Sequence, residues 1–309
     1  MVVAFLENLY NAQTGSFVVA GSVIIATTLH VAFGRRSYRP GASVAYPKDT
    51  VILCGVRRWR DMPCLFSPFP LKLETYLKFA KIPYKVALGK GKGPKGKIPW
   101  IEYNGLKICD SNLIIEFLNE EFKIDLNKNL NPEERAVGRA FQKMAEENMF
   151  WGHAYWLFRQ DHAEWPSISA ILKMTVKYLI FPFVRRKLKK QMYGHGIGRH
   201  TEQELFSIVK KDLRALSTFL GEKKFLFGNE PCEYDCAIFG QLAQQLWCFF
   251  PGSPQKILMK GDLKNLEKYC QLMKEKFWPD WEQCILGNEV PITSLNLYNP
   301  ADPHILKEK

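Results

Sequence analysis

The residues of this chain best suited to chemistry are a serine, a proline and an aspartate–serine pair, all in the first half of the sequence. Ser67 is followed by two prolines and by apolar residues at helical spacing, at positions 71, 73, 77 and 80. This pattern places the Ser67 hydroxyl at the N-terminus of a helix, among unpaired backbone N–H groups and at the positive end of the helix dipole. Such a position lowers the pKa of a thiol bound nearby. The alternative is that Ser67 only caps the helix.

The segments around this helix must bring the other candidate residues to it. Four short apolar runs predict strands, at residues 51–55, 82–86, 98–103 and 106–108. Asn104-Gly105 joins the last two as a hairpin, and Asp110-Ser111 then precedes a helical run over residues 112–122. The glycine- and lysine-rich segment 89–97 is a loop by composition, and its spacing fits neither phosphate-binding glycine motif. The order strand, helix, strand, hairpin, helix predicts a thioredoxin-like domain over residues 50–123.

This order and these residue types resemble the N-terminal domain of the glutathione transferase superfamily. The resemblance implies that Ile98-Pro99 is a cis-proline pair whose neighbouring backbone binds the cysteinyl part of glutathione. It also implies that Asp110 and Ser111 hold the γ-glutamyl end, with Ser111 at a helix N-terminus suited to a carboxylate. Ser67 falls where serine- and cysteine-type transferases carry their catalytic residue. Lys97 is expected either to contact a glutathione carboxylate or to be exposed at the surface.

Longer strings narrow the resemblance to the failed axon connections family, whose relatives are the metaxins. These strings lie at residues 96–104, 126–130, 132–136, 194–199 and 277–279. The resemblance runs from about residue 50 to about residue 282. One departure concerns the sequence Ser-Pro-Phe-Cys, which is frequent in the family, because Pro70 stands here in place of its cysteine. Any redox role of that cysteine is therefore in doubt, and Cys64 is either an ordinary loop cysteine or the redox partner in a Cys-x-x-Ser string.

Charge and cysteine content narrow the class of partner. The 309 residues carry a formal net charge of +12 and include eight cysteines without zinc-like spacing. Since no secretory cleavage pattern is present, reduced thiols in a cytosol-facing protein are expected rather than disulfides. The basic residues lie in short runs, at residues 35–36, 57–58, 90–97 and 185–190. No nucleic-acid motif accompanies these runs, which excludes a nucleic-acid partner and leaves an anionic membrane surface or a solvated face without function.

The N-terminal segment has the composition of a membrane anchor. Residues 17–33 are apolar and uncharged, a length at the short end for a spanning helix. Basic residues follow at positions 35, 36 and 39, so the positive-inside rule places the globular domains in the cytosol. We therefore expect a single uncleaved anchor within residues 1–40 and a tether over residues 41–49. A cleaved helix, or one that only grazes the membrane, is the alternative.

Residues 124–286 are expected to form an all-helical domain, followed by a loose tail over residues 287–309. Asn131-Pro-Glu-Glu and Thr201-Glu-Gln-Glu mark two helix starts, and Cys232 stands where a Ser or Thr cap would be expected. Trp151 and Tyr155 line either an apolar substrate pocket or an ordinary helix contact. His153 between them either faces this pocket or is a hydrogen-bonded core histidine. His195 and His200 make a poor metal site without a neighbouring carboxylate or thiol.

Two classes of function remain open. In the first, the protein is an enzyme that binds glutathione and conjugates or reduces small apolar electrophiles, with Ser67 stabilising the thiolate. In the second, the transferase fold is a non-catalytic scaffold for protein contacts at a membrane, as the resemblance to metaxins implies. The family resemblance also implies a role in axon development. Whether the chain forms a transferase-like homodimer is left open.

Overall fold

The computed structural model of the chain describes residues 47–56, 58, 63–64, 67–88, 90–159, 181–249, 252–285 and 297–298. The expected anchor over residues 17–33 lies outside these ranges, as does most of the tether. Within them, no helix combines the length and apolar character needed to cross a membrane. The elements discussed below belong to one compact unit, Ala45–Arg159 and Lys190–Lys309. A second unit contributes only the first part of α7 (Phe181–His195) to the described residues.

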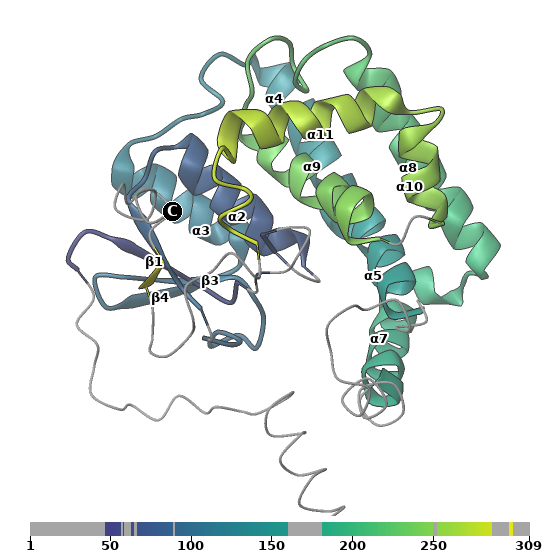
Figure 1. The fold of residues 1–309 in the computed structure, drawn as a ribbon, viewed down its shortest axis with the longest axis horizontal. Helices are drawn as coiled ribbons and strands as arrows, with labels where there is room; N and C mark the ends of the chain where they lie inside the picture. The colour runs from purple at the N-terminus through teal and green to yellow at the C-terminus, as the bar shows by residue number, and fades with distance from the viewer. Residues whose placement is uncertain are drawn as a thin grey trace, which may run out of the picture. The chain divides into compact units, whose positions relative to one another are not determined.

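The first half of the unit is a thioredoxin-like domain, as predicted. Its sheet has the order β4-β3-β1-β2-β5. The strands are β1 (Val51–Cys54), β2 (Tyr84–Ala87), β3 (Trp100–Tyr103), β4 (Leu106–Cys109) and β5 (Leu297–Tyr298). Only the β1–β2 pair is parallel, because helix α2 (Pro68–Phe79) forms the crossover between these strands. Helix α3 (Ser111–Phe122) follows β4 (Figure 1). Strand β5 lies in the tail that was expected to be loose.

The second half is helical, as predicted. Its elements are α4 (Pro132–Lys143), the π-helical turn η1 (Met144–Met149), α5 (Phe150–Arg159), the short η4 (Ile197–Arg199), α8 (Glu202–Leu220), α9 (Glu233–Ala243), the π-helical turn η5 (Gln244–Cys248), α10 (Pro254–Lys260) and α11 (Lys264–Phe277). Both predicted helix starts are capping boxes. The Asn131 side chain accepts from the Glu134 N–H at 2.8 Å, and the Glu134 carboxylate accepts from the Asn131 N–H at 2.9 Å. The Thr201 box has the same reciprocal pattern.

Helix α9 begins with a capping box in which Cys232 is the N-cap and the buried Asp235 is the third helical residue. Its carboxylate accepts from the backbone N–H groups of Cys232, at 2.8 Å, and Leu226, at 2.9 Å. The Tyr269 hydroxyl donates to the same carboxylate at 3.0 Å. The start of the helix therefore depends on the carboxylate of its third residue, Asp235, and a cysteine can occupy the N-cap position at residue 232.

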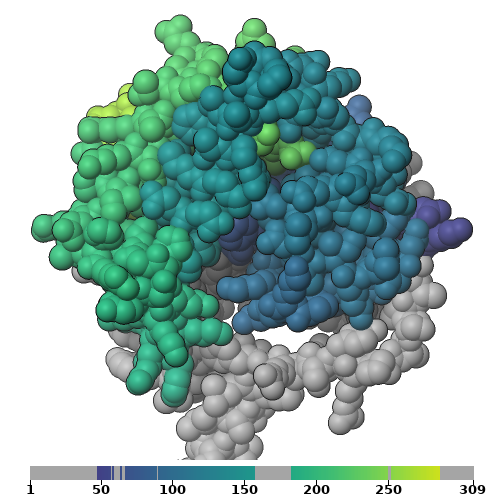
Figure 2. All heavy atoms as spheres, turned by 180° about the vertical axis from the view of Figure 1, so that it is seen from behind, coloured from purple at the N-terminus to yellow at the C-terminus, as the bar shows by residue number. Residues whose placement is uncertain are grey.

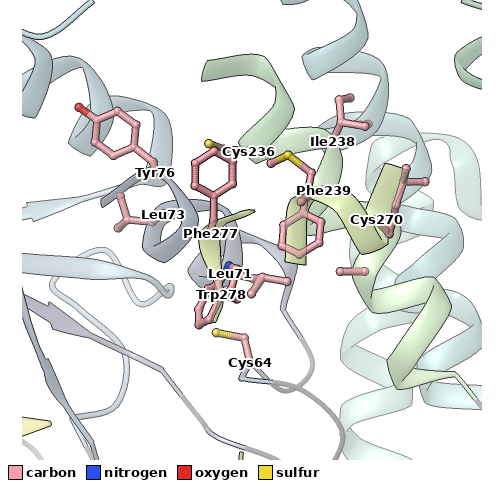
Figure 3. Close-up of a cluster of buried hydrophobic side chains, with 14 of the residues drawn as sticks. Cys64, Leu71, Leu73, Tyr76, Cys236, Ile238, Phe239, Cys270, Phe277 and Trp278 are labelled. Carbon is pink, nitrogen blue, oxygen red and sulfur yellow. The ribbon is translucent and has the colours of Figure 1, made fainter. Parts of the chain in front are cut away.

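The two domains share one hydrophobic core, built where α2 packs against α9. Figure 3 shows α2 side chains, Leu71, Leu73 and Tyr76 among them, beside residues of α9 and the end of α11. The approach of the two helices is close. A Cβ atom added to Gly240 of α9 would lie 2.8 Å from the Pro68 carbonyl oxygen. From behind, the blue surface of the sheet domain meets the teal surface of the first helices of the helical domain (Figure 2).

Arg58, from the basic run at residues 57–58, does not lie on a solvated or membrane-facing surface. Arg58 is only 7% exposed, and its guanidinium donates to both carboxylate oxygens of Glu74, each at 2.8 Å. Tyr84 donates to the same carboxylate at 3.2 Å. Because a bidentate arginine–carboxylate pair satisfies both partners, the charge of Arg58 is used inside the fold. The expectation of a surface role is therefore wrong for this residue.

Candidate functional site

The register of the sheet brings the sequence-predicted segments to one end of the domain. Cys54 pairs with Trp100, and Trp100 pairs with Cys109. The last residue of β1, the first of β3 and the last of β4 therefore form one row across the sheet. Pro99 and Asp110 are the next residues beyond this row, and the chain that leaves β1 reaches Ser67 at the start of α2. This sheet end, together with the first turns of α2 and α3, is the candidate site.

The predicted cis peptide bond is present between Ile98 and Pro99. Pro99 is buried, and Ile98 is half-buried. The loop after β1 touches this pair through Gly55, whose φ is +84° and where an added Cβ would lie 2.7 Å from Ile98 Cγ2. Glycine is required here both for its backbone conformation and for the close approach. Lys97 is exposed, which is the alternative expected for this residue.

Ser67 occupies the N-cap position of α2 in an extended conformation, with φ −146° and ψ 125°. Ser67 thus holds the N-cap position that was expected, but its hydroxyl makes no capping hydrogen bond. Its backbone carbonyl accepts from the Gln244 side-chain N–H at 3.2 Å, and the same amide donates to the Cys64 carbonyl at 2.9 Å. Gln244 thus ties the loop before α2 to the end of α9 through the backbone of Ser67, whose side chain is half-buried.

Cys64 is not suited to redox chemistry. It is 1% exposed. Burial raises the pKa of its thiol well above the ordinary value, and the nearby Glu74 carboxylate raises it further. Since the thiolate is the reactive form, Cys64 behaves as a core thiol. The alternative of an ordinary loop cysteine therefore fits the structure better than the redox hypothesis.

At the start of α3, Asp110 and not Ser111 caps the helix, which differs from the roles expected for these two residues. Asp110 is the N-cap, and its Oδ1 accepts from the N–H groups of Asn112, at 2.9 Å, and Leu113, at 3.4 Å. Asp110 has φ +82°, a backbone conformation that Asp and Asn tolerate better than most side chains. Ser111 is the first helical residue, 4% exposed, and is not the cap. Its N–H is one of the first-turn donors without an intrahelical acceptor, so an anion can still bind there.

An aromatic row leads from the first turn of α2 into α5. The ring centroids of Phe69 and Phe150 lie 5.3 Å apart, those of Phe150 and Trp151 5.2 Å, and those of Trp151 and His195 5.0 Å. Trp151 is half-buried, and within the described part of the chain its Nε1 has no hydrogen-bond partner. Tyr155 lies one turn further along α5, half-buried, with its ring edge against Trp156 at 6.2 Å. The row forms an apolar wall next to the helix that Ser67 begins.

His153 belongs to the core and not to this wall. It is 1% exposed and stacks on Phe249, with centroids 5.2 Å apart and an interplanar angle of 6°. Burial lowers its pKa from 6.5 to about 3. Of the residues that the structure describes, none forms a hydrogen bond with either ring nitrogen. The expectation of a core histidine is confirmed, but the expected hydrogen bond is absent from the described contacts.

The two histidines near the end of α7 do not converge on a metal. The His195 ring lies against Trp151, whereas His200 Nδ1 is 3.9 Å from the Glu204 carboxylate. In the described ranges, no three His, Cys, Asp or Glu side chains are grouped so that they could hold a metal ion. The turn Gly196-Ile-Gly198 lies between the two histidines. It is closely packed at Gly198, because a Cβ added there would lie 2.6 Å from the Met192 carbonyl carbon.

Comparison with known proteins adds family information to this geometry. Models of the glutathione S-transferase N-terminal and C-terminal domains match residues 68–163 and 209–273. Failed axon connections of Drosophila melanogaster is 30% identical over 258 residues, which cover 77% of this chain and 60% of that protein. Isoprene-epoxide–glutathione S-transferase of Rhodococcus sp. is 28% identical over 225 residues, 68% of this chain and 92% of the enzyme. Human Metaxin-1 is 27% identical over 240 residues, 72% of this chain and 49% of that protein.

Proposed function

Because the chain belongs to the failed axon connections family, a metaxin-related branch of the glutathione transferase superfamily, we propose that it binds glutathione at the sheet end formed by Ser67, Pro99 and Asp110. The observation that carries the proposal is the row from β1 through β3 to β4, since it brings Pro99 and Asp110 to the edge of the sheet at which the chain leaves β1 toward Ser67. The matched part of the chain spans 60% of the fly protein, so the activity of the whole relative does not transfer automatically.

The chemistry of the site suits the γ-glutamyl end of the tripeptide. Asp110 uses Oδ1 for the helix cap, which leaves Oδ2 of this exposed carboxylate for an ammonium group. The free N–H of Ser111 and the positive end of α3 suit the neighbouring carboxylate. The backbone next to Pro99 would pair with the cysteinyl residue, as the family resemblance implies. The Ser67 hydroxyl, which is not used in capping, would donate to the sulfur.

For the reaction we propose conjugation of a small apolar electrophile that rests against the wall of Phe150 and Trp151. The thiolate sulfur forms a bond to an electrophilic carbon, and the displaced or ring-opened oxygen takes up a proton from solvent. An epoxide is a suitable class of substrate, in keeping with the name of the Rhodococcus relative. Ser67 and the dipole of α2 would stabilise the thiolate before attack.

The second candidate is a non-catalytic scaffold for protein contacts at a membrane. Its support is the similarity to Metaxin-1 and to Failed axon connections. Under either candidate we propose that residues 17–33 anchor the chain and that its globular domains face the cytosol, because the basic residues follow the apolar run.

Calorimetric titration of the detergent-solubilised full chain with glutathione tests the proposal. The matched ligand is the dipeptide cysteinylglycine, which lacks the γ-glutamyl group but keeps the thiol. We expect glutathione to bind and the dipeptide to bind far more weakly. Absence of binding at millimolar glutathione would refute the proposal and favour the scaffold.

A further inference from the structure

Four polar side chains from four different helical elements meet behind the candidate site. This buried cluster consists of Lys72 of α2, Asn112 of α3, Gln142 of α4 and Glu146 of η1. Lys72, Glu146 and Gln142 are 2%, 3% and 5% exposed. Lys72 Nζ lies 2.5 Å from Glu146 Oε1. The ammonium of Lys72 therefore sits in the interior, paired with one carboxylate.

Asn112 is the centre of the cluster, because its amide contacts all three partners. Its Oδ1 accepts from Lys72 Nζ and from Gln142 Nε2, each at 2.6 Å. Its Nδ2 donates to Glu146 Oε2 at 2.9 Å. Hence the Lys72 ammonium, the Glu146 carboxylate and the Asn112 amide form hydrogen bonds with one another.

The same residue is also part of the candidate site. The backbone N–H of Asn112 donates to the Asp110 carboxylate at 2.9 Å, so the cap and the buried cluster meet in a single residue. On the other side, Lys72 is five residues after Ser67 in the sequence. Its backbone lies close to α9, because a Cβ added at Gly240 would lie 3.3 Å from the Lys72 nitrogen. The cluster therefore connects the first turn of α3 to the second turn of α2, the two helices that frame the site.

Stability alone does not explain a buried ion pair. Desolvation of the two charges offsets most of their attraction, and apolar replacements of similar volume are often equally stable. What an apolar contact cannot supply is direction, because it does not fix the rotation of one helix turn about its axis. An amide that makes short hydrogen bonds to three partners does fix this rotation.

We propose that Asn112 and Lys72 are positioning residues, which hold the first turn of α3 in a fixed orientation to α2 so that Asp110, Ser111 and Ser67 face one ligand. The ligand part of this inference rests on the proposed binding of glutathione. The orientation of the turn is a property of the free protein and can be measured without any ligand.

The test compares Asn112→Ala with Asn119→Ala in the full chain. Both asparagines lie on α3, and both link it to α2 and to the helical domain. Asn119 accepts from the Tyr76 hydroxyl and donates to Glu233, each at 2.8 Å. Asn112→Ala leaves the Lys72–Glu146 pair and the Asp110 cap in place. Amide hydrogen exchange of residues 112 and 113, whose N–H groups donate to Asp110, is measured without ligand, and glutathione binding is measured by calorimetry.

We expect Asn112→Ala to raise the amide exchange rates of residues 112 and 113 and to weaken glutathione binding, each by about tenfold. Asn119→Ala should change neither by more than about twofold, whatever its effect on the melting temperature. A second variant, K72M/E146Q, removes the buried charges together and should behave like Asn112→Ala. Exchange in all variants equal to that of the wild type overturns the inference. If the wild type binds no glutathione, the proposed function fails, and the exchange data still decide the positioning role.

Discussion

Replacement of Asp110 by Asn is expected to separate the two tasks of this residue. In the structure its Oδ1 caps α3 through two backbone N–H groups, while Oδ2 remains for the ligand. Asn keeps a side-chain oxygen for the cap, is among the preferred N-cap residues, and tolerates the φ of +82°. The substitution therefore removes only the charge that would meet the ammonium of the γ-glutamyl group.

The expected loss follows from the kind of hydrogen bond that disappears. A hydrogen bond to a charged group contributes about 1.5–3 kcal/mol, so Asp110→Asn should weaken glutathione binding by about ten- to a hundredfold. The free energy of unfolding should stay within about 0.5 kcal/mol of the wild-type value, because the cap is retained. Calorimetric titration and thermal melting on the same preparations measure both quantities.

Two companion variants complete the comparison. Asp110→Ala loses both cap and charge and places a Cβ-bearing residue without a local hydrogen bond at positive φ, so it should also destabilise the fold by about 1–2 kcal/mol. Ser111→Ala should leave stability nearly unchanged, because Ser111 is not the cap. If Asp110→Asn binds glutathione as tightly as the wild type, the carboxylate does not meet the ammonium, and the assignment of the γ-glutamyl site is refuted.

Three further predictions use other parts of the chain. Ser67→Ala should lower turnover of a model epoxide by about 10²-fold with little change in glutathione affinity, and equal turnover in both proteins would exclude a catalytic role. His153→Phe should make the free energy of unfolding less sensitive to acid, because the pKa of His153 is about 3 in the folded state and 6.5 in the unfolded state. In the wild type this difference stabilises the fold above pH 6.5 and is lost below it, by about 2 kcal/mol at pH 5 (1.5 pH units at 1.36 kcal/mol each). Thermal melts that show the same acid sensitivity in both proteins would contradict this. The full chain should stay in the membrane fraction after alkaline carbonate washing and be released when residues 1–40 are deleted; extraction of the intact chain by carbonate would refute the anchor.

Most of the sheet domain could be predicted from the sequence because its determinants are local. The Asn104-Gly105 hairpin and the prolines at the start of α2 each act within a few residues, as does the Asn131 capping box in the helical domain. The site could be located for the same reason, since strand order and the turn after each strand decide which residues reach one end of the sheet. The boundaries of the four predicted strands and the two predicted helices shifted by one or two residues, whereas strand β5 in the tail was not predicted.

What the sequence did not reveal depends on distant partners or on backbone conformation. Arg58 looked like part of a surface run, because nothing near it indicates that Glu74 lies opposite it in the interior. Asp110 and Ser111 are both good caps in sequence, and only the chain direction after β4 decides between them. Asn112 is separated from Glu146 by 34 residues, and a single amide within a helix carries no local signal of such a role.

The shared core of α2 and α9 has a consequence for how the protein unfolds. Because the helix that carries Ser67 is packed into the helical domain, with Trp278 donating to Thr75 at 3.0 Å, neither domain keeps its interior when the other is lost. We expect one cooperative melting transition for the whole unit. A ligand at the sheet end, present at about a hundred times its dissociation constant, should therefore raise the unfolding free energy of both domains together by about 2.7 kcal/mol. The helices far from the site would thus report its occupancy as faithfully as the sheet.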